Sequence, residues 1–142
     1  MTSINSLIDS HYIDRSIIGF VESVVIVKNS RTKKLVDARI DSGATKCSID
    51  ESLVKDMKLG PFTGESTIKN ANGTKIRKTL NITFIMSGKE ITETFTVADR
   101  SKMEFPVLIG RNALRKGFLI DPNKRTHRIA SKDQMSLNNF KR

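Results

Sequence analysis

Two tight-turn signals, Asn72-Gly73 and Ser87-Gly88, most constrain what this chain can fold into. Asn-Gly between alternating segments is the strongest short-range signal of a β-hairpin, because both positions of the turn need positive φ. Short segments rich in β-branched residues, or alternating apolar and polar residues, surround both turns. They predict strands over residues 17–28, 34–41, 65–69, 74–78, 79–86, 90–98, 105–109 and 117–122.

Only two segments have the spacing of a helix. Residues 48–59 repeat apolar side chains at helical intervals, with Ser48 and Glu51 as a capping box. Residues 110–116 are long enough for about two helical turns. Many short strands and one or two short helices predict an all-β fold, for which a small closed or orthogonally packed β-barrel is the natural solution.

The length of 142 residues is that of one domain. We expect a loose N-terminal arm over residues 1–16, the folded domain over 17–123 and a basic tail over 124–142. The single cysteine excludes an internal disulfide, and with only two histidines it excludes the common zinc sites within one chain. No secretory signal and no apolar run long enough to span a membrane is present, so we expect a cytoplasmic protein with no membrane contact.

The net charge of +10 is concentrated near the C-terminus. Residues 101–142 contain 10 Lys and Arg against 3 Asp and Glu, a net charge of +7. Such a segment favours acidic partners, nucleic acid among them, but it is also what a solvated tail looks like. Phe140 is the only aromatic residue of the tail, which argues against stacking on single-stranded nucleic acid.

The most informative motif is the turn Asp41-Ser42-Gly43-Ala44, which follows an apolar strand directly. Gly43 allows a close approach of backbone segments, and Ser42 can form a hydrogen bond across a symmetric contact. Amide hydrolysis by acid–base chemistry can use two carboxylates that share a proton. The chain contains Asp-Ser-Gly once, so a second copy related by a two-fold axis would have to supply the other carboxylate. By itself the motif is also that of an ordinary turn.

Residues 40–44 resemble the active-site turn of retropepsin-type aspartic proteases. Residues 107–114 resemble the second signature of that class, an apolar strand that enters Gly-Arg-Asn-x-Leu at the start of a helix. The spacing of about 65 residues is similar too, as is the hairpin where a flap would lie. The similarity covers roughly residues 18–123. It is greatest to a microbial branch called the ATP-dependent zinc protease or RimK/LysX family, which is associated with ATP-grasp amino-acid ligases.

The resemblance implies a role for each matching residue of the turn. Asp41 would be the catalytic carboxylate, and the hydroxyl of Ser42 would form a bond across the dimer axis. Gly43 and Ala44 would line the substrate cleft. The flap tip is assigned by position alone, and its residues are Asn70, Ala71, Asn72 and Gly73.

Arg111, followed by Asn112, matches an arginine that braces the active-site loop in this class. Retroviral enzymes carry an acidic residue just after the turn, whereas this chain has Thr45. Arg111 is therefore expected to pair with Asp121 or Asp50, or to cap a loop. Asp99-Arg100 is expected to form a structural pair in a turn.

These observations predict a homodimeric aspartic endopeptidase that cleaves peptides or proteins, among them acidic or modified peptides. We expect no cofactor and no metal, because the sequence lacks a His-Glu-x-x-His motif and a phosphate-binding glycine loop. Two alternatives stay open. One is a peptide-binding domain of the same fold without catalysis, and the other is a module that binds nucleic acid or ribosomes through the basic C-terminal segment.

Overall fold

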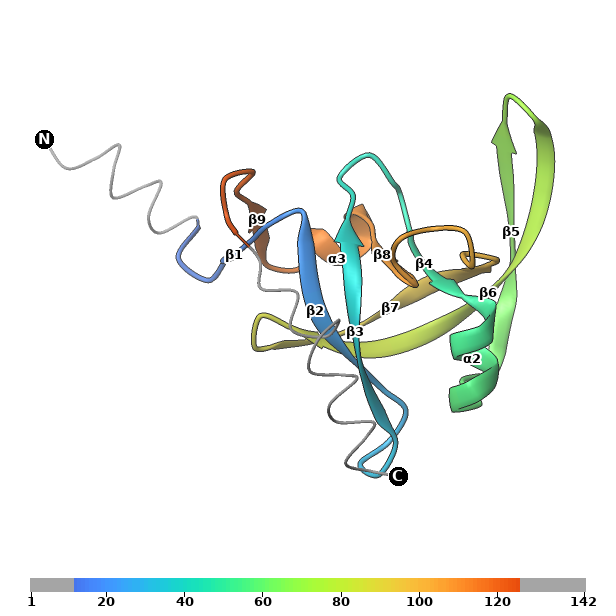
Figure 1. The fold of residues 1–142 in the computed structure, drawn as a ribbon, viewed down its shortest axis with the longest axis horizontal. Coiled ribbons are helices and arrows are strands. Elements are labelled where there is room, and N and C mark those ends of the chain that lie inside the picture. The colour runs from blue at the N-terminus through green and yellow to red at the C-terminus, as the bar shows by residue number, and fades with distance from the viewer. Residues whose placement is uncertain (1–11, 126–142) are drawn as a thin grey trace, which may run out of the picture.

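Residues 12–125 are described by a computed structural model, in which short strands are joined by turns and two short helices (Figure 1). The elements are β1 (Ser16–Ile18), β2 (Val21–Val27), β3 (Lys33–Ile40), β4 (Cys47–Asp50), α2 (Glu51–Met57), β5 (Phe62–Asn70), β6 (Gly73–Met86), β7 (Lys89–Ala98), β8 (Val107–Ile109), α3 (Arg111–Leu114) and β9 (Phe118–Ile120). None of the helices in this part of the chain is long and apolar enough to cross a membrane.

Six strands close into a barrel. They pair in the order β2, β3, β8, β4, β7 and β6, and β6 pairs back with β2 from Val24–Met86 to Val27–Thr83. β5 extends this sheet beyond β6, so that the β5–β6 hairpin projects from the barrel (Figure 1). The prediction of an all-β fold with a small closed barrel is confirmed.

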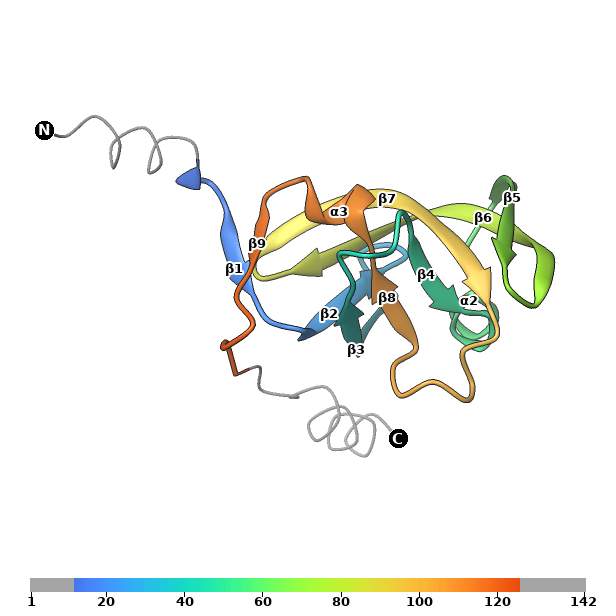
Figure 2. The same ribbon diagram turned by 90° about the horizontal axis from the view of Figure 1, so that it is seen from above.

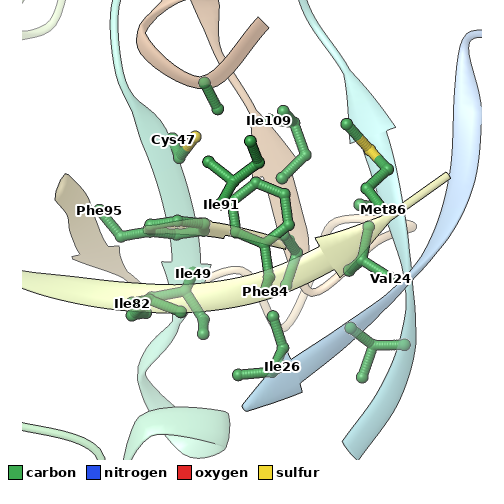
Figure 3. Packing of buried hydrophobic residues seen from close by; sticks show 14 of the residues in the cluster. Val24, Ile26, Cys47, Ile49, Ile82, Phe84, Met86, Ile91, Phe95 and Ile109 are labelled. Atoms are coloured by element: carbon green, nitrogen blue, oxygen red, sulfur yellow. The ribbon is translucent and has the colours of Figure 1, made fainter. Parts of the chain in front are cut away.

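The barrel interior is filled by the inward side chains of the strands (Figure 3). Along β2, buried and half-buried residues alternate, which places Val24 and Ile26 inside. The rings of Phe84 and Phe95 meet edge to face, with centroids 5.7 Å apart. Each fully buried side chain of this size stabilises the fold by about 1.5–3 kcal/mol relative to exposure. This core fixes the strand ends from which the candidate site is built.

β1 and β9 form a separate two-stranded parallel sheet, with Ile17 opposite Leu119. In both Figure 1 and Figure 2 this small sheet lies at the opposite end of the molecule from the β5–β6 hairpin. The predicted strand over residues 17–28 is therefore interrupted. The break is at Gly19, between β1 and β2. Its N–H donates to Glu22 Oε2 at 2.8 Å, which holds the turn from β1 into the barrel strand β2.

The predicted helix over residues 48–59 is wrong in its first turn. Residues 47–50 form β4, because Ile49 fills a fully buried place between β7 and β8. The Ser48 capping box does not form, and Asp50 caps α2 instead by accepting from the N–H of Ser52. The strands predicted over 74–78 and 79–86 are one strand, β6.

The expected N-terminal arm (residues 1–16) and basic tail (residues 124–142) lie mostly outside the described residues. Lys124 is within them, and its Nζ lies 3.0 Å from Glu22 Oε2 and donates to the carbonyl of Ile17 at 3.1 Å. The first residue of the tail thus packs against the fold.

Candidate active site

Asp41 lies where β3 leaves the barrel. β3 runs parallel to β8, with Ile40 opposite Ile109, and the N–H of Asp41 donates to the carbonyl of Ile109 at 2.9 Å. The N–H of Gly43 donates to Asp41 Oδ1 at 2.8 Å, so the turn itself holds the carboxylate. A Cβ on Gly43 would lie only 3.1 Å from the same oxygen. The half-buried carboxylate is thus fixed at the end of a buried strand pair, still open to solvent.

Arg111 joins the two sequence signatures. Its Nη1 donates to the carbonyl of Ser42 at 3.0 Å, and its Nη2 lies 3.2 Å from Thr45 Oγ1. Its N–H donates to the carbonyl of Ala44 at 2.8 Å. Arg111 therefore caps the loop of residues 42–45, and Thr45 supplies a neutral oxygen where an acidic residue stands in retroviral enzymes.

The two acidic residues considered as partners of Arg111 are engaged elsewhere. Asp50 accepts from the N–H of Arg100 at 2.6 Å, and Asp121 accepts from the N–H of Asn123 at 2.9 Å. The expected alternative pairing of Arg111 with either acid is therefore not formed.

Asn112 fastens the far end of the same loop. Its Oδ1 accepts from the N–H and from the thiol of Cys47, both at 3.2 Å, and its Nδ2 donates to the carbonyl of Thr94 at 2.9 Å. Burial raises the pKa of the Cys47 thiol to about 12, so the thiol is a neutral hydrogen-bond donor. Cys47 is thereby a structural residue of this loop.

The β5–β6 hairpin occupies the place predicted for the flap. Asn70 pairs with Gly73, which leaves Ala71 and Asn72 as the two turn residues. Gly73 has a φ of 119°, a value that favours glycine. The four predicted flap-tip residues are therefore together at the end of a long hairpin, although the turn lies one residue before the Asn72-Gly73 pair that predicted it.

A cleft of about 520 Å³ separates this hairpin from the loop that follows Asp41. Ala44 and Thr45 border it on the loop side, and Ser66 and Ile68 border it on the hairpin side. Of the four residues of the predicted turn, only Ala44 lines this cleft, and Asp41, Ser42 and Gly43 do not.

The cleft is basic. Its lining contains four cationic side chains and no acidic one, and they are Lys46, Lys69, Arg77 and Arg100. Desolvation by burial lowers the pKa of the Arg100 guanidinium, and the nearby charge of Arg77 lowers it further, while Asp50 and Asp41 act in the opposite direction. Arg77 and Arg100 thus lie close enough for their charges to interact.

Sequence reasoning did not place Lys69, Arg77 or Arg100 in a cleft. Arg100 does not pair with Asp99, which accepts instead from the hydroxyl of Ser101 at 2.6 Å. Arg100 Nε donates to the carbonyl of Phe105 at 3.0 Å, which orients the guanidinium. No local sequence pattern identifies these residues as neighbours, because the β5–β6 hairpin and the loop between β7 and β8 come together only in the folded protein.

Metal ligands do not gather in this part of the protein. Among residues 12–125, no group of three or more His, Cys, Asp and Glu side chains is placed to hold a metal ion.

The closed barrel, the Asp-Ser-Gly turn at a strand end and the hairpin above it define the retropepsin-like class of fold. The model of the RimB-like family, described as "Retropepsin-like aspartic endopeptidase RimB", matches residues 57–131. This match spans just over half of the 142 residues, and the chain belongs to that family. The matched residues include the flap and Arg111 but begin after Asp41.

Two solved structures place the fold in context. The protein Lpg0085 of unknown function from Legionella pneumophila is 17% identical, with a TM-score of 0.55 over 78% of this chain and 96% of that one. The protease of a simian foamy virus is 20% identical, with a TM-score of 0.49 over 67% of this chain and 91% of that one. No match was found among curated proteins.

Proposed function

We propose that the protein is a homodimeric aspartic peptidase in which each copy contributes one Asp41. The observation that carries this proposal is the placement of Asp41 at the end of β3, where the Gly43 N–H holds its carboxylate and the next residues of the same loop, Ala44 and Thr45, border the cleft. Two side-chain hydrogen bonds from Arg111 hold the loop that carries Asp41. A catalytic group needs such support, because small displacements reduce catalysis.

The chemistry follows from two carboxylates brought together by a two-fold axis. Two carboxyl groups held side by side cannot both be ionised without strong repulsion, so the pair holds one proton, as in aspartic proteases generally. The ionised Asp41 accepts a proton from water, whose oxygen attacks the peptide carbonyl. The protonated Asp41 of the second copy donates to the carbonyl oxygen. The first Asp41, now protonated, then donates its proton to the amide nitrogen while a hydroxyl of the tetrahedral intermediate returns a proton to the second Asp41. The C–N bond breaks, the amine leaves, and the dyad again holds one proton.

The small β1–β9 sheet is the surface at which we place the contact with the second copy. The side chains of Ile17 and Leu119 are 55% and 37% exposed although they lie opposite each other in the sheet. A shallow groove of about 290 Å³ joins Leu119 to Ser42 and Arg111 at the candidate turn. Exposed apolar surface that is continuous with the turn is what a dimer axis through the active site needs.

The four cations of the cleft support a preference for peptides with carboxylate side chains near the scissile bond. They are unbalanced by acidic residues within the cleft lining, so an acidic segment would be attracted to it.

The experiment is cleavage of a peptide library by the full chain and by Asp41→Asn, from acidic to neutral pH, with the sedimentation state of each protein recorded. We expect cleavage by the parent protein alone, enrichment of acidic peptides among its substrates, and a bell-shaped pH profile. Asp56→Asn, an exposed acid on α2, is the matched control and should retain activity. Turnover by Asp41→Asn at the parent rate would refute the proposal.

Two binding measurements, one with peptides and one with nucleic acid, test the two alternative functions. A well-formed dimer that binds peptides equally with and without the Asp41 carboxylate, and cleaves none, would be a binding domain of the same fold. Binding of nucleic acid that falls steeply with salt, and is lost on deletion of residues 124–142, would favour the basic-tail module instead.

A further inference from the structure

A second groove, of about 570 Å³, lies between helix α2 and the base of the flap hairpin. Val54, Leu59 and Val97 line it; Val54 is part of the hydrophobic core, and the other two pack against that core. Phe62 and Ile76 also line it, although their side chains are 48% and 67% exposed. Large apolar side chains that remain open beside a core-lined groove mark a surface for a partner.

The same groove is strongly basic. Lys55, Lys58, Arg77 and Lys78 line it, against the single carboxylate of Glu51. The Lys78 ammonium lies 4.9 Å from the centre of the Phe62 ring, which places a charge directly over one of the apolar walls. The surface thus combines an apolar floor with a cationic rim.

We propose that this groove is a docking surface, separate from the cleft, for an acidic segment of a protein partner that also carries apolar side chains. The apolar side chains would cover Phe62 and Ile76, and the carboxylates would face the lysines of the rim. Charge complementarity selects this occupant over a second copy of the chain or its own basic tail, because the net charge of the chain is +10.

The groove is distinct from the candidate active site. Its lining shares only Arg77 with that of the cleft, and it includes none of residues 41–46. Docking there does not require the Asp41 carboxylate, so the proposal stands or fails independently of peptidase activity. A partner held at this groove would nevertheless sit against the base of the flap, whose strand β6 carries Ile76.

The test measures binding by fluorescence anisotropy, with the full-length protein in the Asp41→Asn form so that no probe is cleaved. The probe is a short fluorescein-labelled peptide of alternating glutamate and leucine. Two control probes replace every leucine by serine or every glutamate by lysine. We expect saturable binding of the first probe and at least several-fold weaker binding of both controls, because apolar contact and charge each contribute.

Variants then locate the binding. Ile76→Ser should weaken it by about tenfold, the loss expected when one apolar side chain leaves a buried contact. Met103→Ser is the matched control, because Met103 is exposed to a similar degree, 61%, but lies on the loop between β7 and β8. Lys55→Glu should weaken binding, whereas Lys33→Glu, at an exposed lysine that lines neither the groove nor the cleft, should not.

Three results would overturn the proposal. Equal binding by Ile76→Ser and the parent protein would remove the groove from the interaction. Loss of binding in Lys46→Glu alone would assign the probe to the cleft. Tighter binding after deletion of residues 1–11, or a dimer that Ile76→Ser converts to a monomer, would show that this chain itself occupies the groove.

Discussion

At Gly110 the backbone has no room for a side chain. A Cβ there would lie 2.5 Å from the carbonyl oxygen of Lys46 and 3.0 Å from that of Ala44. Both contacts are with backbone of the loop that follows Asp41, so neither can be relieved by rotating a side chain. This one position couples the start of α3 to the geometry of the candidate active site.

Gly110→Ala is therefore expected to lower the free energy of unfolding by about 1–3 kcal/mol, the range typical of overpacking. Urea denaturation followed by circular dichroism measures it. Gly64→Ala is the matched control, because its added Cβ would make an ordinary 3.6 Å contact with Thr79 Oγ1. That control should change stability by no more than about 0.5 kcal/mol. Equal stability of the two variants would contradict the close packing at Gly110.

Cys47 makes stability depend on pH in the alkaline range. Burial raises the pKa of its thiol from 9.0 to about 12, so between these values the unfolded chain releases a proton that the folded chain retains. The free energy of unfolding must then fall as pH rises from 9 toward 12, and this contribution is fully present below pH 9. Chemical denaturation at several pH values should give a shallower decline for Cys47→Ala than for the parent protein. An unchanged slope would exclude the thiol as the source.

At the level of elements, the loop after β3 and the start of α3 form one unit. Arg111 supplies two side-chain hydrogen bonds to this loop, to the Ser42 carbonyl and to Thr45 Oγ1. A lysine cannot reach both acceptors, because its ammonium is a single point whereas a guanidinium is a rigid fork.

Arg111→Lys should therefore lower stability by only about 1 kcal/mol while it lowers kcat by about tenfold to a hundredfold, because a small displacement of Asp41 is costly in catalysis. Thermal unfolding and steady-state cleavage measure the two effects. Thr45→Val removes one acceptor and should show a smaller loss of kcat. Its effect should not add to that of Arg111→Lys, because the two residues share a contact. Full additivity would argue against the brace.

The sequence predicted those elements whose conformation depends on residues that are neighbours in the chain. The strand before Asp41 was predicted over residues 34–41 and is found over 33–40, because alternation is visible within the segment. Asn72-Gly73 predicted the hairpin of β5 and β6, whose turn is at Ala71 and Asn72. Residues 48–50 were wrongly assigned to a helix, because Ile49 is placed by partners on β7 and β8 that are distant in sequence. The cations of the cleft were missed for the same reason.

At the scale of the whole molecule, the proposed dimer requires that the β1–β9 sheet contact the second copy. Leu119→Lys adds a cation beside Arg111 and Arg115 on each copy, so repulsion and lost apolar contact should act together. We expect this variant to be folded but monomeric in sedimentation velocity, and at least about tenfold less active at the same concentration. Met103→Lys, on an exposed site elsewhere, should remain like the parent. An active dimeric Leu119→Lys protein would place the interface on another surface.

The pairing of β1 with β9 also bears on when the protein can first act. β1 is near the beginning of the chain and β9 is near the end of the described residues, so their sheet is among the longest-range contacts of the fold. A chain that is still being translated has β1 but no β9, and its first strand has no partner. If the dimer forms through this sheet, assembly has to wait until β9 has been synthesised and has left the ribosome. The order of translation would then keep a nascent peptidase inactive beside the other polypeptides that emerge from the same ribosomes.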